Sequence, residues 1–139
     1  MEIIKLSKIA SILAFIIGTM AIVAGGKVII GIMPDYYVID WLPVYNFSMG
    51  LISFFFTAVL IWKNSKYTLA AAVSTLGIHS IVMIILQTAY QGIVAPDSTR
   101  AMTLRIITWT IISALILTQS WLTKEARANK VQGQGAHGG

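Results

Sequence analysis

Four long apolar stretches, separated by short polar segments, constrain this chain more than any other feature. They cover about residues 9–31, 44–62, 67–94 and 99–122. A helix needs roughly 20 apolar residues to cross a bilayer, whereas membrane β-strands need only about 10 with strict alternation. The sequence therefore predicts an all-α fold, an integral membrane four-helix antiparallel bundle over residues 1–123. We expect the first stretch to stay uncleaved, because three further spans follow it.

Composition supports a protein solvated mainly by lipid. Of the 139 residues, 57% are hydrophobic and only 11% are charged, whereas soluble domains carry about 25% charged residues. Four spans use almost the whole length, which excludes a separate soluble catalytic domain. The chain has no cysteine, which excludes disulfides, thiolate metal sites and iron–sulfur clusters, and no metal site is predicted.

The positions of the charges predict how the spans are oriented. The net charge is +5, but the basic residues flank apolar segments instead of forming a stripe, so we expect no nucleic acid partner. Basic residues gather at the N-terminus, at residues 63–66 and after residue 123, whereas the other two loops carry Asp35, Asp40 and Asp97. The positive-inside rule then predicts cytoplasmic N- and C-termini in an inner (plasma) membrane, multi-pass. Residues 124–139, ending in a Gly- and Gln-rich segment, are predicted to be a disordered cytoplasmic tail.

Each span carries a line of small or polar residues that should face other helices, since unpaired polar groups are costly in hydrocarbon. Such lines predict a compact bundle with a partly polar core. They are Ser7, Ser11, Gly18 and Gly25 in the first span; Asn46, Gly50, Ser53 and Thr57 in the second; Thr75, His79, Met83, Gln87 and Gln91 in the third; Arg105, Trp109 and Ser113 in the fourth.

Four of the polar residues should lie at similar depth below the outer surface. Depth is counted inward from the outer end of each span, at a rise of about 1.5 Å per residue. On this count Lys27, Gln87 and Arg105 lie about 10 Å deep, and Asn46 lies slightly shallower. Charged residues inside a membrane are expensive and are therefore candidates for function. We interpret this layer as an outward-facing pocket in which Lys27 and Arg105 hold an anionic or polar lipid-like ligand, oriented by Asn46, Gln87 and Tyr90.

Two structural interpretations compete with the pocket. In the first, Asp35 or Asp40 folds back onto Arg105 and Lys27 and forms an internal ion-pair network. In the second, Lys27 extends its ammonium group to the interface. Asp35 and Asp40 are near enough in sequence to form such pairs, which favours the internal ion-pair network.

His79 is the one histidine within the spans and should lie near the midplane. Its ordinary role would be a hydrogen-bonded core residue; a redox or proton role, with quinone or a metal as its ligand, is the alternative. A second histidine that would allow bis-His haem ligation is missing from the spans. No carboxylate shares its helix to orient the ring as a triad requires, so no catalytic residue is predicted.

Three short patches resemble a group of small four-span bacterial membrane proteins that have no assigned function. The patches are Trp41-Leu42-Pro43-Val44-Tyr45-Asn46, Gly77-Ile78-His79 and Ala101-Met102-Thr103-Leu104-Arg105 with Trp109. In size and layout the chain is also similar to DoxX-like membrane proteins. These resemblances imply a bacterial membrane location and add interest to Asn46, His79 and Arg105.

Three function classes follow from the sequence. The favoured one is a small accessory or binding protein of the membrane that uses the outward-facing pocket. A membrane oxidoreductase subunit that contacts quinone or metal through His79 is the alternative, and an oligomeric transporter or channel subunit is the third. The expected partners are the lipid bilayer and either another membrane protein or further copies of the chain.

Overall fold

Four long helices make up the fold, and the described residues include no strand. The computed structural model describes the backbone of residues 2–136 and 138, and side chains from Leu6 onward apart from residues 137 and 139. The first helix is α1 (Glu2–Ile29). The second span joins α2 (Leu42–Leu51), a π-helical turn η1 (Ile52–Thr57) and α3 (Ala58–Trp62), and it is followed by α4 (Thr68–Thr88) and α5 (Pro96–Ala136).

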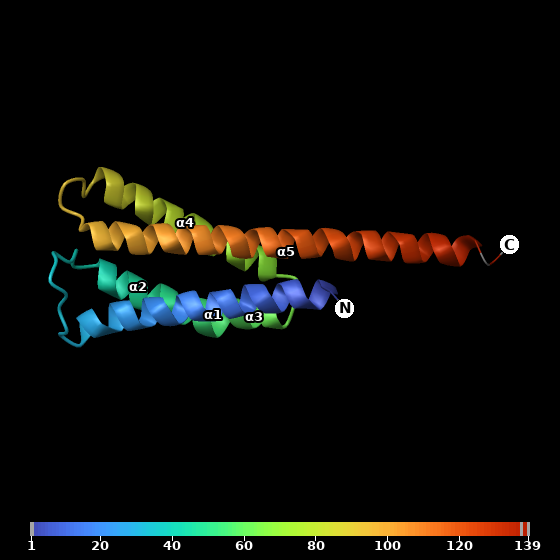
Figure 1. The fold of residues 1–139 in the computed structure, drawn as a ribbon, viewed down its shortest axis with the longest axis horizontal. Helices are drawn as coiled ribbons and strands as arrows, with labels where there is room; N and C mark the ends of the chain where they lie inside the picture. The colour runs from blue at the N-terminus through green and yellow to red at the C-terminus, as the bar shows by residue number, and fades with distance from the viewer. Residues whose placement is uncertain (1, 137, 139) are drawn as a thin grey trace.

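The helices run up and down, so that sequence neighbours are antiparallel (Figure 1). The loops 30–41 and 89–95 lie at one end of the molecule, here called the loop end. The N-terminus and the turn at residues 63–67 lie toward the other end. Helix α1 packs against the second span and against α5, whereas α4 packs against α5 and against η1. The all-α prediction is confirmed.

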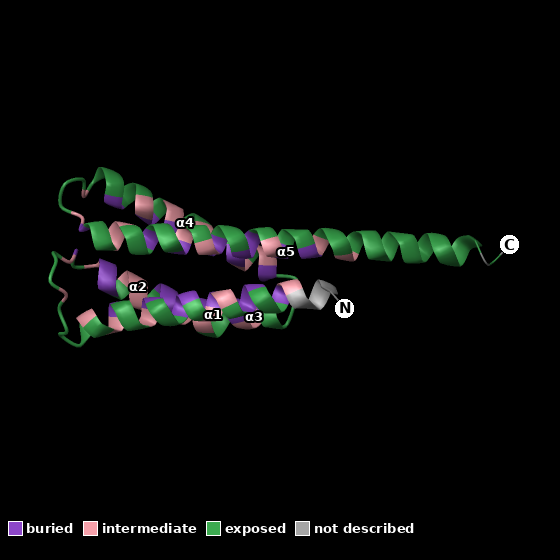
Figure 2. Ribbon diagram, in the orientation of Figure 1, coloured by how far each residue is buried: buried purple, intermediate pink, exposed green. Residues whose placement is uncertain are grey.

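All four helices are long and apolar enough to cross a membrane. The second span has 21 residues, which at about 1.5 Å per residue matches a hydrocarbon core about 30 Å thick. Only 28% to 39% of each span is buried inside the protein, and the outer faces carry exposed isoleucines such as Ile16, Ile81 and Ile107. Figure 2 shows that exposed residues occur along the whole length of each helix. A continuous apolar surface of this kind is suited to contact with lipid.

Helix α1 lies unusually close to the second span because small residues line its inner face. Ser7 and Ser11 donate hydrogen bonds to the backbone oxygens of Ile61 and Ala58, both at 2.8 Å. Farther along, a Cβ placed on Gly25 would lie 2.5 Å from the Pro43 oxygen. These contacts confirm the predicted small-residue face of the first span, which permits backbones to approach.

The structure corrects two of the predicted boundaries. The third span ends as a helix at Thr88, not at residue 94, because the chain turns before Gly92, whose φ is +82°. The tail predicted to be disordered over 124–139 continues α5 to Ala136, while residues 137 and 139 lie outside the described part. Extending an existing helix adds one hydrogen bond per residue without a new nucleus, and residues 124–130 include strong helix formers.

Candidate functional site

The buried arginine of α5 forms the centre of the candidate site. Arg105 is only 5% exposed and its guanidinium donates a hydrogen bond to the Oδ1 atom of Asn46 in α2. It lies on the inner face of α5 with Met102 and Trp109, each 1% exposed or less. Asn46 and Arg105, two of the four residues predicted to lie at similar depth, are thus in direct contact.

A small pocket surrounds this pair at the loop end of the bundle. Its volume is about 60 Å³, enough for a few water molecules or one small polar group, since a single water needs at least about 10–15 Å³. No carboxylate is among the residues that line it, which come from α1, the first loop, α2 and α5: Ala24, Val28, Tyr36, Val38, Leu42, Pro43, Asn46, Ser98, Ala101, Met102 and Arg105.

The predicted ion-pair network is not present in the part of the chain that the structure describes. There the one salt bridge joins Arg100 and Asp97 at 3.8 Å, both at the exposed start of α5. Asp35 and Asp40 are exposed on the first loop instead of folding onto Arg105. Arg105 is thus a buried cation whose hydrogen-bond partner is a neutral amide.

Two predicted members of the layer face away from it. Lys27 is exposed, because it lies two residues beyond Gly25 and two residues turn an α-helix by about 200°. Gln87 is also exposed, whereas its neighbour Leu86 is buried. The predicted line in α4 used a step of four residues, which drifts about 40° per step from a face that repeats every 3.6 residues. The observed buried face alternates steps of three and four: Thr68, Ala72, Thr75, His79, Val82 and Leu86.

Tyr90 belongs to an aromatic cluster and not to the arginine pocket. Its hydroxyl accepts a hydrogen bond of 3.0 Å from the Trp41 Nε1 atom. The Trp41 ring also packs edge-on against Tyr45, with centroids 6.1 Å apart. The cluster ties the first loop to the end of α4 and closes the bundle beside the pocket.

His79 is a satisfied core residue in this arrangement. It is 2% exposed, and its Nδ1 atom is hydrogen-bonded to the Tyr45 hydroxyl at 2.5 Å. Because Tyr45 and Asn46 are adjacent in α2, the second span is tied to α4 and to α5 by consecutive side chains. Tyr45 is a site residue that no polar line in the sequence indicates, although its spacing of four residues from Trp41 is the signal that places both rings on one helical face.

The tyrosine–histidine bond makes a testable prediction about stability. Tyr45→Phe keeps the ring but leaves the buried His79 nitrogen without its partner, which should lower the free energy of unfolding by about 1–3 kcal/mol. Tyr37→Phe, at an exposed position, is the control and should change nothing. Reversible unfolding in mixed detergent micelles measures both. Equal stability of the two variants would show that the bond does not hold His79 in place, and would restore it as a candidate ligand.

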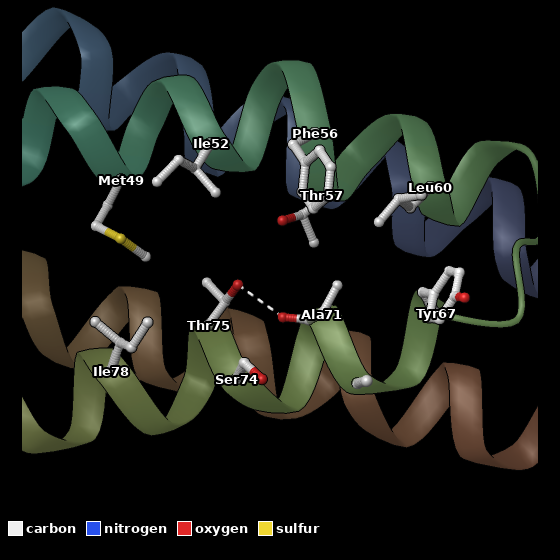
Figure 3. A pocket seen from close by; sticks show the side chains of 11 residues that line it. Met49, Ile52, Phe56, Thr57, Leu60, Tyr67, Ala71, Ser74, Thr75 and Ile78 are labelled. Carbon is white, nitrogen blue, oxygen red and sulfur yellow. Dashed lines mark hydrogen bonds between the residues drawn. The ribbon is translucent and has the colours of Figure 1, made fainter.

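A second, larger pocket lies between the second span and α4. It is an apolar groove of about 560 Å³, and Met49, Ile52, Phe56, Thr57 and Leu60 form one wall while residues of α4 form the other. Figure 3 shows the two walls facing each other, with the Thr57 and Thr75 side chains near the middle. The groove lies between hydrogen bonds that join the second span to α4 at Tyr45–His79 and at Leu60–Thr68. His79 does not line it.

Comparison with protein-family models, with curated proteins and with solved structures finds no match for this chain.

Proposed function

We propose that this chain is an integral membrane protein that binds a single oxoanion group, such as a phosphate or a carboxylate, in the pocket of Arg105 and Asn46. The observation that carries the proposal is the burial of the Arg105 guanidinium, 5% exposed, in a pocket lined by no carboxylate. A buried charge is costly unless a partner of opposite charge joins it. An anionic ligand supplies that partner.

The donors around the pocket suit an oxoanion. A guanidinium presents parallel N–H groups that match two oxygens of a phosphate or carboxylate. The Asn46 Oδ1 atom already accepts from Arg105, so the amide NH₂ group is the end left for a ligand. Ser98, in the first turn of α5, and Tyr36 add hydroxyl groups, and the partial positive charge of a helix N-terminus also favours an anion.

The size of the pocket limits which part of the lipid-like ligand predicted from the sequence can enter it. About 60 Å³ admits the anionic group but leaves the rest of a lipid-like molecule outside. The shared chemistry is one small oxoanion, whether free or attached to a lipid. We propose binding and not catalysis, because the pocket holds no side chain arranged as a nucleophile with a base.

Titration of the purified protein with three probes tests the proposal. The probes are inorganic phosphate, acetate and short-chain phosphatidic acid, with heats of binding measured in mild detergent and native mass spectrometry of the same sample. Binding of phosphate or acetate would identify a free anion as the ligand. Binding of phosphatidic acid alone would identify a lipid headgroup. A protein that binds none of the three, and carries no anion from the cell, would contradict the proposal.

The orientation proposed for the bundle places this pocket on the extracytoplasmic side of a bacterial inner membrane. Support comes from Lys63 and Lys66 at the end opposite the loops, and from Asp35, Asp40 and Asp97 at the loop end. Basic residues are retained on the cytoplasmic side, so both termini are cytoplasmic.

Cysteine labelling measures this orientation directly, because the natural chain has no cysteine. Asp40→Cys, at an exposed position of the first loop, should react with a membrane-impermeant maleimide in spheroplasts. Lys66→Cys, exposed at the opposite end, should react only after the membrane is permeabilised. The reverse pattern would place the arginine pocket on the cytoplasmic side.

A further inference from the structure

Gln119 of α5 is buried without a partner for its side-chain oxygen. The residue is 5% exposed, and its Nε2 atom donates a hydrogen bond of 3.1 Å to the Oδ1 atom of Asn64. Its Oε1 atom accepts no hydrogen bond from the described residues, among which Ser113 Oγ is the other buried side-chain atom in this state. A buried acceptor without a donor is destabilising. The Gln119 oxygen therefore points to a donor from outside the chain.

Gln119 lines a pocket at the end of the bundle opposite the loop end (Figure 1). This pocket, here called the glutamine pocket, has a volume of about 130 Å³ and lies between α1, the turn at residues 63–67, α4 and α5. Its volume suffices for a small polar group, since a single water molecule needs at least about 10–15 Å³. The glutamine pocket is separate from the arginine pocket, because no residue lines both.

The hydroxyl groups that the helices contribute to this pocket offer lone pairs and not hydrogen atoms. Ser7 and Thr68 donate to backbone oxygens of the second span at 2.8 and 2.9 Å. Ser120 donates to the backbone oxygen four residues earlier at 3.0 Å. A hydroxyl whose hydrogen is already used can only accept further hydrogen bonds. Together with the Gln119 oxygen, these groups suit a ligand that donates several hydrogen bonds.

Positive charge lies at the exposed side of the pocket. Lys66 lines the pocket and is exposed, and its Nζ atom lies 4.9 Å from the centre of the Tyr67 ring. No carboxylate is among the lining residues. A bare cation held by the acceptors would be repelled by Lys66. A cationic donor that carries an anionic group beside it would instead be attracted at both ends.

The pocket lies at the level expected for lipid headgroups. The second span ends beside it at Trp62, and α4 begins at Thr68. Trp62, Tyr67 and Trp121 are exposed around this end of the bundle, and Trp and Tyr are enriched at the interfaces between membrane and water. Headgroups of the surrounding bilayer are therefore the polar groups that meet this pocket.

We propose that the glutamine pocket binds a lipid whose headgroup is a primary ammonium joined to a phosphate, as in phosphatidylethanolamine. A primary ammonium has three N–H donors on one atom, which suits Gln119 Oε1 and the neighbouring hydroxyl oxygens. The phosphate, two carbon atoms away, lies at Lys66. A glycerol headgroup donates only one hydrogen from each hydroxyl. A choline headgroup has the same charges but no hydrogen on its nitrogen.

Three lipids that differ only in the headgroup test the proposal. The probes are dioctanoyl phosphatidylethanolamine, phosphatidylcholine and phosphatidylglycerol, titrated into the full chain in mild detergent. Phosphatidylethanolamine should bind at least about 10-fold more tightly than phosphatidylcholine, because each hydrogen bond from a charged donor contributes about that factor or more. The arginine pocket cannot produce this difference, since both lipids carry the same phosphate. Equal affinities of these two lipids, tighter binding of phosphatidylglycerol, or no binding at all would overturn the proposal.

Variants of Gln119 test the acceptor itself. Gln119→Leu should abolish the preference for phosphatidylethanolamine while the chain still folds, because its partner Asn64 is exposed and can bond to water. Gln119→Glu adds a negative charge beside the ammonium and should strengthen binding severalfold. Gln132→Glu, at an exposed position of the same helix, adds an equal charge and should change nothing. Weaker binding by Gln119→Glu would mean that the pocket takes an anion, and a preference retained in Gln119→Leu would place the ammonium elsewhere.

Two lysines of one turn test the contact with the phosphate. Lys66→Gln should weaken binding of phosphatidylethanolamine and phosphatidylcholine alike, by up to about 5-fold, since exposed ion pairs contribute little. Lys63 is also exposed but does not line the pocket, so Lys63→Gln should leave both affinities unchanged. Equal effects of the two substitutions would show that the phosphate does not lie at Lys66 and would overturn this placement of the headgroup.

Discussion

Replacing Arg105 with methionine should weaken oxoanion binding by at least about 100-fold. A hydrogen bond to a charged group contributes about 1.5–3 kcal/mol, and a guanidinium offers two such bonds to one oxoanion, while each 1.4 kcal/mol corresponds to a tenfold change in affinity. Methionine keeps much of the volume of the arginine stem but removes the charge. The measurement is the titration with phosphate and phosphatidic acid described for the natural protein.

A nearby arginine provides the control. Arg100 lies one and a half turns earlier in α5, at the same end of the bundle, but its side chain is 82% exposed and pairs with Asp97. Arg100→Met removes an equal charge and should alter the affinity little, since exposed charges are screened by water and salt. Equal losses in the Arg100 and Arg105 variants would indicate general attraction of anions to a basic surface, and the pocket would not be the binding site.

The stability of the Arg105 variants separates a binding site from a structural network. Arg105→Met alone leaves the Asn46 amide without its partner, so the double variant Arg105→Met/Asn46→Leu is the cleaner measurement. Replacing both partners of a buried polar pair by apolar groups is often neutral or stabilising. We therefore expect the ligand-free double variant to unfold no more easily than the natural protein, and a loss of several kcal/mol would assign the pair a structural role.

The inner faces of the helices could be predicted wherever the sequence repeats with the helical period. In α1 the small residues follow one another at steps of four, seven and seven, and the structure places Ser7, Ser11 and Gly25 against the second span. The similar depth of Asn46 and Arg105 could be predicted because the rise per residue is the same in every helix, whereas their hydrogen bond could not. The depth of a residue does not determine which side of its helix it lies on. The prediction that Lys27 and Gln87 face the arginine pocket is wrong for this reason.

The π-helical turn and the pockets could not be predicted from the sequence. Nothing in Ile52-Ser53-Phe54-Phe55-Phe56-Thr57 distinguishes a π-helical turn from an α-helical one, because the difference lies in one backbone hydrogen bond and not in side-chain pattern. Pockets depend on how far two helices separate, and that distance is set by all their contacts together. The continuation of α5 to Ala136 depends on helix propagation from a stable span, which a composition-based prediction of disorder neglects.

Adding one methyl group at Gly25 should cost as much stability as removing a large core side chain. A Cβ at this position would lie 2.5 Å from the Pro43 oxygen and 2.6 Å from the Phe47 nitrogen. Both are backbone atoms of α2, so neither can rotate away as a side chain could. Gly25→Ala should therefore lower the free energy of unfolding by about 3 kcal/mol or more, at the upper end of the overpacking range.

The neighbouring glycine provides a matched control for that measurement. A Cβ on Gly26 would lie 3.5 Å from the Phe47 ring, an ordinary contact, and alanine is favoured over glycine in a helix by about 1 kcal/mol. Gly26→Ala should therefore leave stability unchanged or raise it, whereas Gly25→Ala should lower it, when unfolding is followed by circular dichroism in mixed micelles. Because Ala24 and Pro43 line the arginine pocket, Gly25→Ala should also weaken oxoanion binding by displacing α2. Equal stability of the two alanine variants would mean that α1 and α2 do not approach this closely, and the pocket between them would lose the wall that closes it.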